Sequence, residues 1–251
     1  MLKYFLIALV VLLVVALVGC ASQPAVLKST KTYSITKDIH SLDVEINAAD
    51  FVIVEGDNFS VESNLKNLSV SEEEGVLKIV EKTRFARNYN GASLKLCIPK
   101  GMTFENANIK TGASKLTAES FSASVLELKT GAGRVEFERL EASENANIKG
   151  GAGEISIKDG NLNNLTLDLG VGELNMKAQL IGESDLKFGV GESDITLLGN
   201  RADYSFDIKS GVGNITVDGE SSAFIANSTK GESLVKIKGG VGSTNITFQE
   251  K

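Results

Sequence analysis

A short glycine signal, Gly-x-Gly, recurs along most of this chain and constrains its fold more than any other feature. It stands between two short stretches in which apolar and polar residues alternate. Its copies begin at Gly112, Gly131, Gly151, Gly170, Gly189, Gly211 and Gly240, and the first is imperfect, Gly112-Ala113-Ser114. Subtracting successive positions gives steps of 19, 20, 19, 19, 22 and 29 residues. A period near 20 residues predicts a stack of similar units.

The residues around the glycines form uniform columns when the copies are aligned on the first glycine. Three residues before it the chain has Ile109, Leu128, Ile148, Leu167, Leu186, Ile208 and Ile237. Six residues after it stand Ala118, Phe137, Ile157, Met176, Ile195, Val217 and Ile246. Alternation on both sides predicts two strands per unit, each with one inward face. The glycines are expected at a bend, where a side chain would collide with the neighbouring unit.

No helical pattern of useful length follows residue 20, so the sequence predicts an all-β, single-domain β-solenoid with coils of about 19–22 residues. Residues 101–251 are expected to form its regular Gly-x-Gly part. Residues 33–100 are expected to form irregular N-terminal β coils. Within them, Leu68–Val70 and Leu77–Ile79, with Glu72-Glu73-Glu74-Gly75 between them, predict a hairpin.

The N-terminus predicts export. Met1-Leu2-Lys3 is a short positive region, and the run from Tyr4 to Val18 is apolar and uncharged, which suits a secretory signal better than a membrane-spanning helix. Leu17-Val18-Gly19-Cys20 then resembles the lipobox of bacterial lipoprotein precursors. The resemblance implies a signal peptide over 1–19, acylation of Cys20, a tether over 20–32, and attachment to the outer face of a membrane. An uncleaved membrane anchor with an incidental Cys20 is the alternative.

Composition excludes several classes of function. The net charge of −6 disfavours nucleic acid as a partner. With 25 glycines, two prolines and no tryptophan in a strongly aliphatic chain, turn-rich β structure is favoured over disorder. Once Cys20 is acylated, Cys97 has no partner for a disulfide, and it is interpreted as a strand residue.

Three segments together resemble an uncharacterised bacterial family of adhesin-like proteins. They are the stretch from Leu42 to Ile53, the segment Leu96-Cys97-Ile98-Pro99-Lys100-Gly101, and the recurring Gly-x-Gly coils. That family is a domain of unknown function related to the head (GIN) domain of auto-transporter adhesins. The resemblance covers nearly all of the chain after its leader and implies a right-handed β-solenoid. It brings no functional residue with it.

The motifs that could carry chemistry are incomplete. No helix follows any Gly-x-Gly, so a phosphate-binding loop is excluded. Calcium-binding nonapeptide repeats need an aspartate where this chain has Ile155 and Thr244. His40 is the only histidine, and it is interpreted as a solvated or capping residue. We therefore expect no catalytic residue, no metal site and no cofactor.

Two residues before each first glycine lies a column of lysines interrupted once, by Asp168. In a stack these residues would lie about 4.8 Å apart and form a candidate ladder for an anionic ligand. The alternative is a solvated sheet face, since acidic residues lie beside the column. The ladder consists of Lys110, Lys129, Lys149, Lys187, Lys209 and Lys238.

These observations favour a non-enzymatic, lipid-anchored cell-envelope protein used for surface binding or envelope scaffolding. Its expected partners are the membrane, through the lipid on Cys20, and an envelope polymer or surface protein. An exported partner of an envelope stress-sensing system is the alternative from another class. A glycan-active β-helix enzyme is a distant third, because the coils are short and regular.

Overall fold

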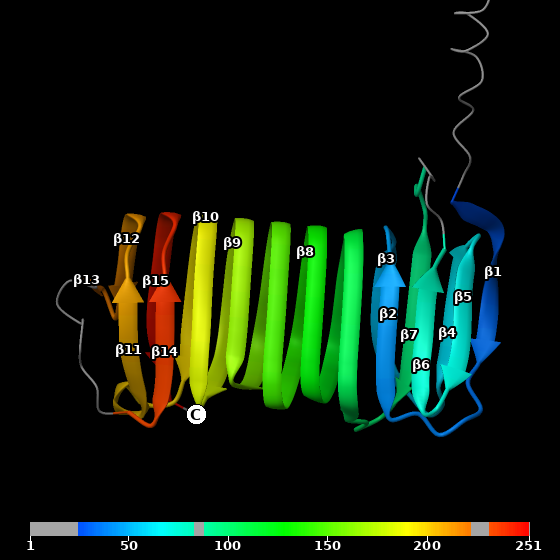
Figure 1. The fold of residues 1–251 in the computed structure, drawn as a ribbon, viewed down its shortest axis with the longest axis horizontal. Coiled ribbons are helices and arrows are strands. Elements are labelled where there is room, and N and C mark those ends of the chain that lie inside the picture. Colours follow the sequence, from blue (N-terminus) through cyan, green and yellow to red (C-terminus); the bar gives the residue numbers. More distant parts are fainter. Residues whose placement is uncertain (1–24, 83–87, 222–230, 251) are drawn as a thin grey trace, which may run out of the picture.

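The computed structural model describes residues 25–82, 88–221 and 231–250, and nearly all of them lie in strands (Figure 1). One 3-10 turn, Arg201–Asp203, interrupts the strands. The N-terminal strands are β1 (Val26–Ser34), β2 (Ser41–Ile46), β3 (Asp50–Gly56), β4 (Ser60–Leu65), β5 (Leu68–Glu73), β6 (Val76–Glu81) and β7 (Ser93–Pro99). The others are β8 (Phe104–Asn163), β9 (Leu165–Ile181), β10 (Glu183–Leu198), β11 (Tyr204–Lys209), β12 (Val212–Val217), β13 (Glu220–Ser221), β14 (Ser233–Lys238) and β15 (Val241–Gln249).

The strands wind into a right-handed β-solenoid, as expected (Figure 1). Each coil has a front strand that runs up to a glycine corner and a back strand that leaves it. The long strand β8 contains three such coils, and β9 and β10 contain one each. Elsewhere a coil is built from two shorter strands, such as β2 with β3 or β14 with β15. Neighbouring coils pair in parallel and in register, for example Leu186 with Leu167 and Ile195 with Met176.

The core is the interior of the stack, and the two apolar columns predicted from the sequence fill it. Ile109, Leu128, Ile148 and Leu167 are fully buried on the front side. On the back side every member of the second column is buried, from Ala118 to Ile246. A row of aromatic rings runs through the N-terminal half. The ring centroids of Phe104 and Phe121 are 5.6 Å apart, and those of Phe121 and Phe137 are 6.2 Å apart.

At the N-terminal end the coils do not follow the order of the chain. The coil of β2 and β3 pairs with β8 on one side and with β6 and β7 on the other. Antiparallel strands then extend this end: β5 pairs with β6, β4 pairs with β7, and β1 pairs with β4. The predicted hairpin is the β5–β6 pair, but its turn is tighter than the predicted Glu72–Gly75, because β5 continues to Glu73. The two turn residues, Glu74 and Gly75, have positive φ.

The C-terminal end corrects the expectation that successive copies lie next to each other. The coil of β14 and β15, last in the chain, pairs with β10 on one side and with β11 and β12 on the other. Val190 therefore lies beside Val241, and Val241 lies beside Val212. The β2–β3 coil and the β14–β15 coil, the first and the last along the chain, are thus each covered on both faces. This protects backbone groups that a coil at the end of the stack would leave unpaired.

The tether is shorter than predicted. Strand β1 begins at Val26, inside the stretch 20–32 expected to be a tether, and the facing residue on β4 is Leu65. The predicted signal peptide and Cys20 lie outside the described residues. Within the parts of the chain that the structure describes, no helix is long and apolar enough to cross a membrane.

Candidate functional site

The glycine corners stack into a straight row that we call the glycine edge. It consists of the six Gly-x-Gly corners and the imperfect corner Gly112-Ala113-Ser114. The third positions are in register along it, because Gly153 pairs with Gly172, Gly172 with Gly191, and Gly191 with Gly242. Front and back strands meet here, so the edge carries residues from both faces of the stack.

Glycine is required at this edge for two reasons. The glycine at the third position of each Gly-x-Gly corner has a positive φ, from 132° at Gly133 to 159° at Gly213, which L side chains rarely adopt. A Cβ added at Gly172 would also lie 1.7 Å from the carbonyl oxygen of Gly153 in the next coil. The predicted collision between neighbouring units is therefore confirmed.

The middle residue of each corner points away from the core. It is alanine in the first three corners and valine from Val171 onward. The four valines form a continuous column in the order Val171, Val190, Val241 and Val212, and they are 57%, 50%, 51% and 75% exposed. Sequence reasoning did not single out this column, although the change from Gly-Ala-Gly to Gly-Val-Gly was its visible signal.

The predicted lysine ladder lies on the front side of the glycine edge. Its order differs from the order in the chain, because the β14–β15 coil is inserted between β10 and the β11–β12 coil. Lys187 lies between Asp168 and Lys238, and Lys238 lies beside Lys209. Lys129 forms an ion pair with Glu127, and Lys187 forms one with Asp185 at 3.0 Å. Because Lys129 and the neighbouring lysines stabilise its charged form, the pKa of Glu127 is lowered. Part of the ladder is thus neutralised within its own face.

The back side of the glycine edge carries a second charged column, which changes sign along the stack. It begins with Lys115 and Arg134, and Arg134 forms an ion pair of 2.8 Å with Glu154. Glu173 and Glu192 follow, and the corners of the two last coils have the neutral residues Ser243 and Asn214. Only the middle of the edge therefore has carboxylates on its back side.

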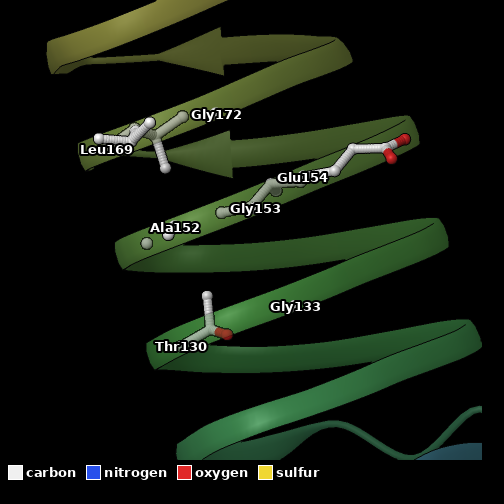
Figure 2. Close-up of a pocket in the computed structure, with 10 residues that line it drawn as sticks. Thr130, Gly133, Ala152, Gly153, Glu154, Leu169 and Gly172 are labelled. Carbon is white, nitrogen blue, oxygen red and sulfur yellow. The ribbon is translucent and has the colours of Figure 1, made fainter.

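A shallow hollow with a cavity volume of about 10 Å³ opens at the glycine edge where Gly150 leaves the inner surface without a side chain. Figure 2 shows Thr130, Leu169 and Glu154 around it. The Thr130 hydroxyl is buried there and has no hydrogen-bond partner. The hollow is too small for a substrate, and its sequence signal was the double glycine Gly150-Gly151.

A second hollow, of about 230 Å³, lies on the back face, and its lining includes Val52, Val54, Glu119, Glu136 and Glu138. It tests the glycosidase alternative, because such enzymes use two carboxyl groups with different pKa values. Here Lys158 forms ion pairs with both Glu136 and Glu138. The hydrogen bond from Lys158 lowers the pKa of Glu136, whereas a general acid needs a raised pKa. These carboxylates form a structural ion-pair cluster.

The remaining polar residues singled out above have structural surroundings. The His40 ring lies 3.2 Å from a carboxylate oxygen of Glu105 and is half exposed. The Cys97 thiol is half-buried on the outer face of β7. In the described ranges no group of histidine, cysteine, aspartate and glutamate could hold a metal ion.

A buried carboxylate, Glu81, contacts the corner of the β2–β3 coil at the N-terminal end. Glu81 accepts a hydrogen bond of 2.8 Å from the backbone N–H of Asn47, in the coil of β2 and β3. It also accepts one of 2.8 Å from the hydroxyl of Tyr89. Burial and this carboxylate raise the pKa of Tyr89 to about 12. Glu81 thus satisfies a backbone donor at the corner of the β2–β3 coil.

Several solved structures and one family model are similar to this chain. A "putative cell adhesion protein" from Clostridium sporogenes is 13% identical over 88% of this chain and 99% of its own, with a TM-score of 0.38. "Putative adhesin" structures from Parabacteroides distasonis and Parabacteroides merdae are 14% and 13% identical over 88% of this chain, with TM-scores of 0.44 and 0.38. They cover 96% and 95% of their own chains. No curated protein matches the sequence. The sequence model of one family matches residues 34–247, almost the whole described stack, and this chain therefore belongs to the Toastrack DUF4097 family.

Proposed function

We propose that this chain is a non-enzymatic, lipid-anchored protein of the bacterial cell envelope, whose solenoid provides a rigid surface for binding or for envelope scaffolding. The observation that carries the proposal is where the chain enters the fold. Strand β1 begins at Val26, at one end of the stack, six residues after the lipobox cysteine Cys20. Six extended residues span at most about 20 Å, so the anchor would hold the stack close to the membrane.

Two features support a binding role over catalysis. In the hollow on the back face, Lys158 forms ion pairs with both Glu136 and Glu138, so these carboxylates are held in a salt-bridge cluster. The surface instead repeats the same residue types from coil to coil, which suits contacts with an extended, repetitive partner. The lysine ladder is our candidate for contacts with an anionic envelope polymer or lipid headgroup.

Replacing Cys20 by serine should move the protein from the membrane fraction to the soluble fraction, because the acyl chains provide the anchoring energy. Fractionation of cells expressing the full chain measures this. The matched control is Cys97→Ser, which removes the other cysteine and should leave the protein with the membranes. Retention of the Cys20→Ser protein in the membrane fraction would show that residues 1–19 are an uncleaved anchor.

A further inference from the structure

We propose that the glycine edge is the membrane-facing side of the solenoid and docks onto anionic phospholipid headgroups. The inference deepens the proposed function and rests on it, because the lipid anchor at Cys20 would hold the solenoid close to a membrane. Three independent features of the described residues meet at this edge: the point where the chain enters, a column of exposed valines, and a column of lysines.

The chain enters the stack on the side of the glycine edge. Val26 pairs with Leu65 at the end of β4, and β4 runs antiparallel to β7. Strand β7 begins at Ser93, level with Asp50, which directly follows the corner of the β2–β3 coil. Val26 therefore lies at the height of the glycine corners. In Figure 1 the top of β1, where that strand begins, is on the same side as the tops of β10, β12 and β15.

The valines form an exposed apolar column along this edge. Val190, Val241 and Val212 lie side by side in three successive coils and are at least half exposed. Glycines precede and follow each of them, so no neighbouring side chain along the corner covers their methyl groups. Exposed apolar side chains that form a continuous patch indicate an interaction surface, and aliphatic groups at the headgroup boundary favour binding to a bilayer.

The lysines beside this valine column indicate the charge of the partner. Lys187, Lys238 and Lys209 lie three residues before the three valines and follow one another in register. Lys238 and Lys209 have no ion pair among the described residues, and like charges directly opposite each other destabilise a sheet. Anionic headgroups would relieve that repulsion. The back side of the last two corners, at Ser243 and Asn214, has no carboxylate to oppose them.

Charge also separates the two long edges of the solenoid. The chain as a whole carries −6, yet cations outnumber acids along the glycine edge. The opposite edge includes Glu141 and Glu144, which have no ion pair among the described residues, whereas Glu138 and Glu183 are paired with Lys158 and Lys236. An anionic leaflet would therefore attract the glycine edge and repel the opposite one, which fixes which side faces the membrane.

The test is binding of residues 20–251, carrying Cys20→Ser, to sedimentable vesicles. This chain contains every strand from β1 to β15 and lacks the acyl chains, so its vesicle binding measures the contribution of the protein surface without the lipid anchor. We expect binding to phosphatidylcholine vesicles that contain phosphatidylglycerol and none to pure phosphatidylcholine. Since each lysine near an anionic surface contributes roughly fivefold, the triple change Lys187→Gln, Lys209→Gln and Lys238→Gln should weaken binding about a hundredfold.

Valine variants separate a bilayer from a soluble polyanion. The triple change Val190→Thr, Val212→Thr and Val241→Thr keeps the β-branched shape and should weaken vesicle binding about tenfold. The matched control, Lys95→Gln, Lys100→Gln and Lys177→Gln, removes three lysines away from the edge and should bind as the parent does.

Absence of vesicle binding, or equal losses in the control and the edge variants, would overturn the proposal. Loss with the lysine variant but not with the valine variant would also overturn it, in favour of an anionic polymer. Because the assay omits acylation, its failure leaves the membrane release by Cys20→Ser unaffected, and the reverse also holds.

Discussion

Replacing Gly172 by alanine should lower the free energy of unfolding by about 3 to 5 kcal/mol, since it combines backbone strain with overpacking. The φ of Gly172 is 146°, and the new Cβ would lie 1.7 Å from the carbonyl oxygen of Gly153. That oxygen belongs to the backbone of the next coil, so the two coils would have to separate at the corner. Urea denaturation followed by circular dichroism measures the loss.

Gly101 is the matched control, because it isolates backbone strain from collision. Its φ is 70°, and an added Cβ would have no atom within 4 Å. Gly101→Ala should therefore cost only about 1 to 2 kcal/mol. Equal losses at Gly172 and Gly101 would show that close approach of the coils is not what requires glycine at the edge.

Deleting residues 232–251 should unfold more than the last coil of the chain. In the observed order, β14 and β15 separate β10 from β11 and β12. Without them, β11 loses the only strand it pairs with in the described residues, and β12 keeps only the two-residue strand β13. Hydrogen exchange should therefore show that the amides of residues 204–217 lose their protection.

A deletion at the other end provides the comparison. Strand β1 is the outermost strand at the N-terminal end and pairs with β4. Removing residues up to Ser34 should leave the protection of β8, β9 and β10 unchanged. Protected amides over 204–217 in the C-terminal deletion would contradict the inserted position of β14 and β15.

The sequence predicted the environment of each residue within a coil more successfully than the order of the coils. Ile208 and Ile237 occupy the same column, so the apolar pattern alone does not indicate which of the two coils pairs with β10. The step of 29 residues before Gly240 was the one sign that the last coil differs. Stack order depends on where that connection leads the chain, and periodicity carries no information about it.

The candidate site was predicted in part for a similar reason. The lysine column could be predicted because its members recur at a fixed distance from the glycines. Its partial neutralisation was also expected from the acidic residues beside the column, as in the ion pair of Lys187 with Asp185. The pairing of Lys238 with Lys209 was not, because these residues become neighbours only through the insertion of β14 and β15. The position of β1 at the glycine edge could not be predicted either, because Val26–Ser34 does not match the repeat pattern.

Disulfide formation between engineered cysteines tests the stacked glycine edge most directly. In a chain with Cys97→Ser and no Cys20, the pair Val190→Cys and Val241→Cys lies in adjacent coils, about 4.8 Å apart, within the range that a disulfide spans. The pair Val190→Cys and Val212→Cys lies two coils apart, about twice that distance, although it is closer in sequence. Oxidation should cross-link the first pair and leave the second as free thiols, whereas efficient cross-linking of the second pair alone would contradict this architecture.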